Sequence, residues 1–174
     1  MEFLKLAKLR QSCRKYDSTK SIEKDKLDSI LEAARLSPSA CNGQPYFITI
    51  CKDEIKNKVA KQTQGMGMNK FASDADVLLV ISEMPYIKSA ALGAKVKNND
   101  YRSIDIGIVA AYITSQAESL GIGSCILGWF DNAKIREICG LSGDVRLVIS
   151  LGYADNEPKR NKKRKAFDEL FKTL

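Results

Sequence analysis

The run VLLVIS at Val77–Ser82 constrains the fold most strongly, because its first five residues are all branched and apolar. Successive side chains of a strand point to opposite faces, so such a strand needs apolar cover on both faces. Two segments, Glu23–Leu36 and Ser103–Leu120, are long enough to be helices that provide this cover. The sequence therefore predicts a small sheet between helices, in an α+β or α/β fold.

Residue spacing and turn residues predict the other elements. The apolar residues of Glu23–Leu36 recur at i, i+3, i+4 and i+7, which is typical of one helix face. Gly107, Ala110 and Ala111 would give Ser103–Leu120 a face of small residues, which allows another helix to approach closely. Further helices are expected at Glu2–Leu9, Asp53–Gln62 and Asn132–Cys139, further strands at Tyr46–Cys51, Ser124–Leu127 and Val145–Tyr153, a loop at Met66–Phe71, and an apolar face at Ala166–Leu174.

Length and composition favour one globular domain over residues 1–174, with 44% hydrophobic and 28% charged residues. No apolar run approaches the roughly 18–20 residues of a membrane helix, and the N-terminus lacks the apolar core of a secretory signal. We therefore expect a cytoplasmic protein without a membrane partner. The five cysteines include no C-x-x-C pair, which favours free thiols over a metal cluster.

The chain contains no histidine, which excludes a Ser-His-Asp or Cys-His nucleophile and a His-bearing zinc site. Proton transfer must use other side chains or water, or a cofactor must carry the chemistry. The net charge is +7, and the segment Pro158–Lys165 holds six basic residues in eight. This charge distribution favours anionic partners such as phosphate groups, nucleic acid or an acidic surface.

Arg10, Ser12 and Arg14 form the first candidate site. In a helix, the two arginines would be four residues apart and share a face; in an extended segment, all three side chains would point to one side. Either arrangement brings together two guanidiniums and a hydroxyl, and guanidinium forks suit phosphate. The alternative is an ordinary solvated basic face.

Two further segments could contact a ligand. The loop from Pro38 to Pro45 crowds hydroxyl and amide side chains before a strand, although an ordinary helix-to-strand loop has the same composition. The segment Gly121–Phe130 is rich in glycine, but it contains neither the dinucleotide fingerprint nor a P-loop. Gly128 before Trp129 could let a flat ligand lie close to the backbone.

Taken in order, four segments resemble the nitroreductase family of FMN-dependent oxidoreductases, and the resemblance covers nearly the whole chain. RQSCRKY at Arg10–Tyr16 is similar to the family's R-x-S-x-R/K-x-F/Y opening, and Leu27–Ile50 is similar to its helix, P-S-x-x-N-x-Q-P loop and first strand. Ile104–Phe130 is similar to the long dimer helix and the strand after it, and Lys162–Lys165 to the basic closing motif.

The resemblance implies an α+β homodimer with a three-layer fold, a mixed central sheet flanked by helices, and FMN bound non-covalently at the subunit interface. By position, Arg10, Ser12, Lys162 and Arg164 would hold the FMN phosphate, and Arg14 would reach the ribityl chain and the N1/O2 edge of the ring. The residues implied around the ring are Pro38, Ser39 and Asn42 from the other subunit, then Ile126, Leu127 and Gly128, with Asn69 and Lys70 at the pyrimidine edge.

The implied activity is hydride transfer from NADH or NADPH through flavin N5 to nitroaromatic, quinone or similar small acceptors in a ping-pong cycle. No residue of the chain is then required as a catalytic group, and no metal is needed. The chain is short for the family, and the region between Val80 and Asp100 lacks a long insertion. The alternatives are a flavin-binding sensor without efficient turnover and a basic nucleic-acid-binding module. No RNA-recognition or zinc signature supports the second, so we expect no nucleic-acid partner.

Overall fold

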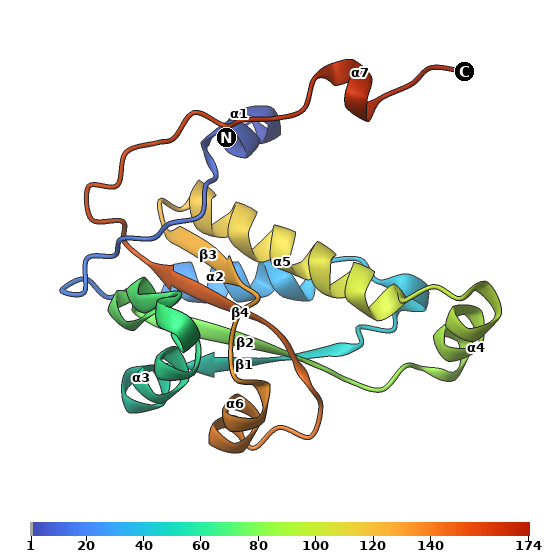
Figure 1. The fold of residues 1–174 in the computed structure, drawn as a ribbon, viewed down its shortest axis with the longest axis horizontal. Helices are drawn as coiled ribbons and strands as arrows, with labels where there is room; N and C mark the ends of the chain where they lie inside the picture. The colour runs from blue at the N-terminus through green and yellow to red at the C-terminus, as the bar shows by residue number, and fades with distance from the viewer. Residues whose placement is uncertain (1) are drawn as a thin grey trace.

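The computed structural model of the chain describes residues 2–174. Its four strands form one sheet in the order β1-β2-β4-β3, and helices lie on both faces of the sheet (Figure 1). The strands are β1 (Tyr46–Cys51), β2 (Val77–Glu83), β3 (Gly123–Leu127) and β4 (Val145–Gly152), within one or two residues of the predicted bounds.

The alternation of side chains along β2 explains the layers. Val77, Leu79 and Ile81 enter the core cluster formed with α2 (Lys24–Arg35) and α5 (Tyr101–Ser119). Leu78 and Val80 enter the opposite cluster, formed with α3 (Asp53–Gln62) and α6 (Asn132–Cys139). The prediction that this strand is covered on both faces is confirmed, and the result is a three-layer α+β arrangement.

The expectation of a mixed sheet is wrong for these four strands, because each neighbouring pair is antiparallel. The reason lies in the connections: the segment with α3 between β1 and β2, and that with α6 between β3 and β4, each return to the end of the sheet they left. Parallel pairing occurs in the described residues as an isolated bridge between Ser12 and Ser124.

Other elements differ from expectation in detail. The helix α4 (Lys88–Lys97) was not predicted, and the segment expected as a loop contains the 3-10 turns η2 (Gly65–Gly67) and η3 (Lys70–Asp74). The prediction that Gly107, Ala110 and Ala111 share one face of α5 is wrong for Ala110. Ala110 is buried, because it shares the core-facing stripe of α5, whereas Gly107 is exposed.

The two ends of the chain lie together. After β4, the C-terminal chain runs beside the segment that follows α1 (Phe3–Leu9), and then continues into α7 (Phe167–Leu170), which stands away from the sheet (Figure 1). Hydrogen bonds confirm the first contact, since Lys159 Nζ donates to the carbonyl of Leu9 at 3.2 Å. No helix within residues 2–174 combines the length and apolar character needed to cross a membrane.

Candidate functional site

The segment Arg10–Tyr16 is extended and not helical, so the second of the two arrangements considered from its sequence is the observed one. The backbone N–H of Cys13 donates to the carbonyl oxygen of Ser124 at 2.8 Å, so the segment lies along the outer edge of β3. The Cys13 side chain is buried, while Arg10 and Ser12 remain partly accessible. Arg10, Ser12 and Arg14 all line one cleft beside this segment.

A glycine allows this close approach. A Cβ atom at Gly123 would lie 2.8 Å from Cys13 Sγ and 3.1 Å from the carbonyl oxygen of Gly152. Both distances are too short for a side chain to be accommodated without movement, so β3 begins with the residue type that leaves room for Cys13.

The C-terminal strap, residues 157–164, is tied to this segment by polar contacts. Gln11 donates from Nε2 to the carbonyl of Pro158 at 3.1 Å and accepts at Oε1 from the backbone N–H of Arg160 at 2.9 Å. The Arg160 guanidinium also donates to the carbonyl of Ser12. Glu157 accepts from the backbone N–H of Arg14 at 2.9 Å. These contacts place the two basic segments of the sequence against each other.

A cleft of about 360 Å³ lies between the segment and the strap. Six of the residues that line it are cationic: Arg10, Arg14, Arg160, Lys162, Lys163 and Arg164, with Gln11, Ser12 and Asn161 completing the wall. Five residues predicted from the sequence to bind phosphate or the ribityl chain, Arg10, Ser12, Arg14, Lys162 and Arg164, therefore share one cleft. Arg160 was not singled out, because a run of basic residues does not reveal which of them turn inward.

The pKa of Lys162 shows the effect of the many positive charges around the cleft. Burial lowers the pKa of its ammonium below the ordinary value, and the nearby positive charges of Arg10 and Arg164 lower it further. A lowered lysine pKa means that the charged form is disfavoured where it stands. An anion in the cleft would relieve this repulsion. Guanidinium forks, ammonium groups and a hydroxyl form the donor set that a phosphate monoester requires.

The loop with Pro38, Ser39 and Asn42 lies elsewhere. The backbone N–H of Ala40 donates to the Asp105 carboxylate at 3.0 Å, which places the loop at the start of α5. The loop contains left-handed backbone at Cys41, Asn42 and Gln44, a conformation that costs energy in residues other than glycine. Ser39 supports it by accepting at Oγ from the backbone N–H of Gln44 at 3.0 Å.

One chain therefore does not bring this loop to the basic cleft. The cleft adjoins the end of α5, where Lys159 of the strap pairs with Glu118. Asp105 and Glu118 are 13 positions apart, which corresponds to about 20 Å along a helix. Pro38, Ser39 and Asn42 thus lie at the opposite end of α5 from Arg10 and Arg14.

The third predicted group lies around the end of β3. Ile126 is 40% exposed, and a Cβ atom at Gly128 would meet no atom within 4 Å, so open space adjoins the backbone there. Leu127 turns its side chain into the core and offers only backbone. The Asn69 side-chain amide donates to the carbonyl of Trp129 at 3.2 Å, which joins the loop after α3 to the end of β3. Lys70 begins the turn η3 beside it.

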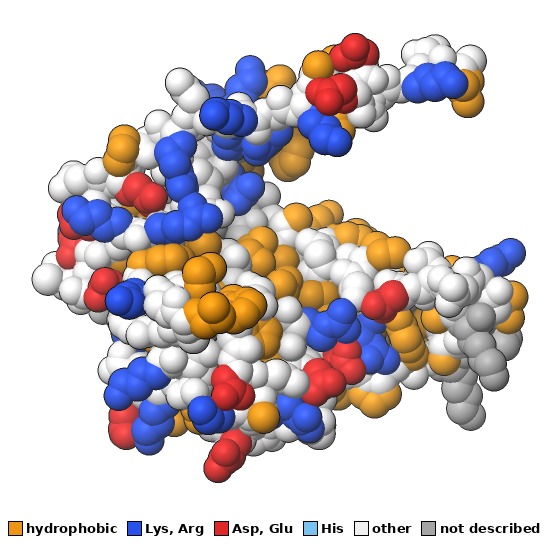
Figure 2. All heavy atoms as spheres, in the orientation of Figure 1, with side chains coloured by type: hydrophobic (Ala, Val, Ile, Leu, Met, Phe, Trp, Pro, Cys, Tyr) orange, Lys and Arg blue, Asp and Glu red, His pale blue; other side chains and the backbone are white. Residues whose placement is uncertain are grey.

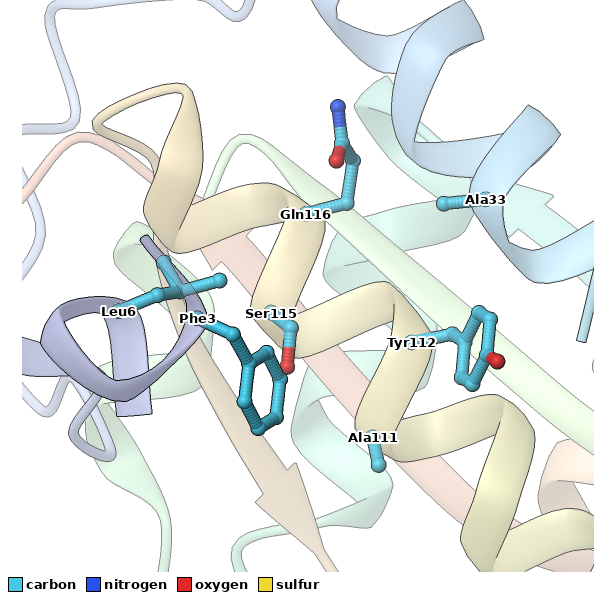
Figure 3. Close-up of a pocket in the computed structure, with 7 residues that line it drawn as sticks. All are labelled: Phe3, Leu6, Ala33, Ala111, Tyr112, Ser115 and Gln116. Atoms are coloured by element: carbon cyan, nitrogen blue, oxygen red, sulfur yellow. The ribbon is translucent and has the colours of Figure 1, made fainter. Parts of the chain in front are cut away.

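An apolar groove of about 410 Å³ lies between α1, α2 and α5 (Figure 3). Phe3 of α1 lies against α5 and is 73% exposed, and Tyr112 of α5 lines the groove nearby (Figure 3). The whole lining consists of Phe3, Leu6, Ala33, Ala111, Tyr112, Ser115 and Gln116. This lining is mostly apolar and carries no charged side chain, so the groove suits an apolar partner rather than an anion.

Beside this groove, α5 carries a second apolar stripe that its own chain does not cover. Ile104, Gly107, Ile108 and Ala111 recur at helical spacing, and of these only Ile108 is half-buried rather than exposed. The arm formed by residues 166–174 stands away from the body (Figure 2). Its apolar residues are exposed: Phe167, Leu170, Phe171 and Leu174. Large exposed apolar surfaces of this kind mark interaction sites.

The fold and the cleft define an α+β protein with helices on both faces of a four-stranded sheet and a cationic cleft built from both ends of the chain. No cluster of three metal-ligating side chains occurs within the described residues.

Comparison with known proteins identifies the family. The profile described as "Nitroreductase family" matches residues 7–153, so the chain belongs to the nitroreductase family. The oxygen-insensitive NADPH nitroreductase of Helicobacter acinonychis is 27% identical over 189 residues, which cover 89% of each chain. The solved structure of an FMN-dependent nitroreductase from Clostridium difficile R20291 is 28% identical, with a TM-score of 0.79 over 98% of each chain. A nitroreductase family protein from Streptococcus pneumoniae TIGR4 has the same fold, with a TM-score of 0.84 at 22% identity over 99% of this chain and 100% of that one.

Proposed function

We propose that the protein is an FMN-dependent oxidoreductase that transfers hydride from NADH or NADPH to small acceptors such as nitroaromatics and quinones. The observation that carries the proposal is the basic cleft, in which cations from positions 10–14 and 160–164 face a common space. The names of two relatives support it, since one is an NADPH nitroreductase and the other an FMN-dependent nitroreductase.

The residues of the cleft fit the phosphate end of FMN. Arg10, Lys162 and Arg164 supply the positive charge, and Ser12 supplies a hydroxyl donor. Bound FMN would supply the hydride chemistry, accepting hydride from the nicotinamide and passing it to the acceptor. The protein then needs no histidine and no metal, because its tasks are to bind, to orient and to shape the electrostatic field.

Arg14 has a different task from the phosphate ligands. Its backbone N–H is held by Glu157, and its guanidinium borders the same cleft. Arginine remains charged at any physiological pH, so it offers a fixed positive charge to the heterocycle beyond the phosphate. Such a charge stabilises the negative charge that the ring gains on two-electron reduction.

The protein acts as a homodimer in this proposal, because the basic cleft and the Pro38–Asn42 loop lie at opposite ends of α5. A two-fold axis across the middle of α5 would set it antiparallel to its copy, with the exposed Gly107 and Ala111 in the contact. The loop of each chain would then lie beside the cleft of its partner. This arrangement also buries the uncovered apolar stripe.

The arm, residues 166–174, supports the same assembly. Its Phe167 and Phe171 rings pack on each other, with centroids 4.4 Å apart, but they are 78% and 59% exposed. A second copy of the chain is always present as a binding partner for this segment. The mostly apolar groove in Figure 3 offers the apolar side chains of the arm a surface to pack on. We assign the arm to the partner's surface.

The acceptor and the nicotinamide would use the open face near Ile126 and Gly128, with Asn69 and Trp129 beside it. Only the short segment with α4 lies between β2 and α5, so the chain has no long insertion there to cover this face. A broad range of small planar acceptors is consistent with an open face.

The decisive experiment is an absorption spectrum of the purified protein, followed by anaerobic addition of NADH or NADPH. The proposal requires a bound yellow chromophore, release of FMN rather than FAD on denaturation, bleaching by a nicotinamide, and return of colour with an acceptor. Bound FMN that neither nicotinamide reduces would instead indicate a sensor. A colourless protein that binds no added FMN would refute the site.

A further inference from the structure

Two cysteines that are 88 positions apart in the sequence lie side by side. The Sγ atoms of Cys51 and Cys139 are 3.8 Å apart, within hydrogen-bonding distance for sulfur. Cys51 is the last residue of β1 and Cys139 is the last residue of α6. The pair therefore joins the sheet to the helical layer that covers one of its faces.

The two thiols differ in accessibility and in acidity. Cys51 is fully buried, and its partner's sulfur and burial both raise its pKa. Cys139 is partly exposed, and its hydrogen bond with Cys51 lowers its pKa. A thiolate is the reactive form of cysteine, so Cys139 is the member of the pair that a reagent in solution would reach first.

The other cysteines have different surroundings. Cys13 directs its sulfur to the carbonyl of Lys15 at 3.3 Å, and Cys125 directs its sulfur to its neighbour's carbonyl at 3.9 Å. Cys41 is exposed in the loop before β1. The contact between two sulfurs therefore distinguishes Cys51 and Cys139, and neither residue lines the basic cleft.

We propose that Cys51 and Cys139 form a redox-modification site, which a hydroperoxide converts into an intramolecular disulfide. The Cys139 thiol gives up its proton, its thiolate attacks the peroxide, and the O–O bond breaks. A sulfenic acid forms, and the leaving oxygen takes up the released proton and departs as water (or the alcohol). The Cys51 sulfur then attacks the Cys139 sulfur, the S–O bond breaks, and the hydroxyl leaves as water with the proton of the Cys51 thiol. The two sulfurs lose two electrons in total, and the peroxide gains them.

Local structure permits the closure. A disulfide bond is about 2.05 Å long, so the sulfurs must approach by roughly 1.8 Å. Cys51 is fixed by the sheet, where it pairs with Leu78. Cys139 ends a helix of only eight residues, and Gly140 follows it in the left-handed conformation. The end of α6 is therefore the side that moves, and the bond would fasten it to β1.

The test uses the full-length, flavin-loaded protein with Cys41→Ser, because trypsin leaves Cys41 and Cys51 on the same peptide, residues 36–52. The protein is treated with hydrogen peroxide, alkylated, digested without reduction and analysed by mass spectrometry. We expect an intact mass lower by about 2 Da and a linked pair of peptides, residues 36–52 with residues 137–146, which dithiothreitol separates.

Two further variants make the result specific. Cys139→Ser in the same background must abolish the linked peptide, while Cys125→Ser must retain it. Absence of the link in the Cys41→Ser protein would overturn the proposal, as would oxidation of Cys139 to sulfinic acid while Cys51 remains free for alkylation. The first measurement needs no substitution in the core, so impaired folding of a core variant cannot obscure the outcome.

Discussion

Gln11 donates a hydrogen bond from its side-chain amide to the carbonyl of Pro158, which lies 147 positions further along the chain, at 3.1 Å. The same amide group accepts from the backbone N–H of Arg160 at 2.9 Å. An uncharged residue therefore connects the two basic segments whose cations line the cleft.

Gln11→Leu tests this connection without changing the charge of the protein. The two exposed hydrogen bonds of Gln11 together contribute about 1 kcal/mol. Their loss should loosen the strap and weaken FMN binding by roughly 5- to 10-fold. Fluorescence titration with FMN measures the effect. Gln62→Leu is the control, since Gln62 lies in α3, far along the chain from both segments. Equal losses in the two variants would show that Gln11 has no special part in the site.

Arg14→Ala should alter the redox properties of the bound flavin. Removal of a fixed positive charge near the ring should lower the midpoint potential by roughly 30 mV, equivalent to about 1.4 kcal/mol. Redox titration at saturating FMN is the measurement. Lys15→Ala is the matched control, because Lys15 is an adjacent cation that pairs with Asp155 at 2.8 Å. A potential unchanged in Arg14→Ala would remove Arg14 from the ring's surroundings.

Ala111→Glu should disrupt the dimer. Ala111 is exposed within the single chain, so the substitution should not harm the isolated fold, but at a two-fold interface it would bury two carboxylates. We expect the dimer dissociation constant to rise by roughly 100-fold or more. Sedimentation velocity compares it with Ala133→Glu, the same substitution at an exposed alanine of α6, on the opposite face of the sheet. A variant that stays as dimeric as this control would place the interface elsewhere.

Glu23 should govern part of the acid sensitivity of the fold. The hydrogen bond from the Tyr153 hydroxyl at 2.6 Å, with support from its own backbone and from Lys26, lowers the Glu23 pKa from 4.5 to about 2. Because the folded pKa is the lower one, the stabilisation is complete above pH 4.5 and is lost as the pH falls through about 2. Thermal melts between pH 6 and 2 should therefore decline less steeply in Glu23→Gln than in the parent protein. Asp25→Asn, in the first turn of α2, is the control, and its curve should lie closer to that of the parent than the Glu23→Gln curve does.

Much of the fold could be predicted from local sequence. The run at Val77–Ser82 required cover on both faces, and Asp131 and Gly140 marked the bounds of α6 because a cap and a left-handed residue leave clear signals. The helix α4 was missed, because its residues KSAALGAKVK contain a glycine and show no clear apolar face. The relative direction of the strands could not be predicted from local sequence either, because it depends on the end of the sheet to which each connecting segment leads.

Part of the candidate site could be predicted from residues whose positions match the motifs of a family. Arg10 and Arg164 could be assigned to one anion from a resemblance, and the strap does bring them to one cleft. Arg160 could not be separated from the other basic residues, because an irregular strap has no period that tells inward from outward. The contact between Cys51 and Cys139 depends on the packing of α6 against the sheet, and no spacing in the sequence encodes it.

The central claim is that the basic cleft holds the phosphate of FMN, and it is tested most directly by comparing FMN with riboflavin, which lacks the phosphate. The account requires the parent protein to bind FMN at least about 100-fold more tightly than riboflavin, since each charge-assisted hydrogen bond contributes about 1.5–3 kcal/mol. Arg10→Ala with Arg164→Ala removes two such contacts, about 3 kcal/mol or more, and should lower this preference by about 100-fold or more, while Arg35→Ala, whose guanidinium pairs with Glu32, should keep it. Equal binding of FMN and riboflavin by the parent protein would contradict the assignment of the cleft.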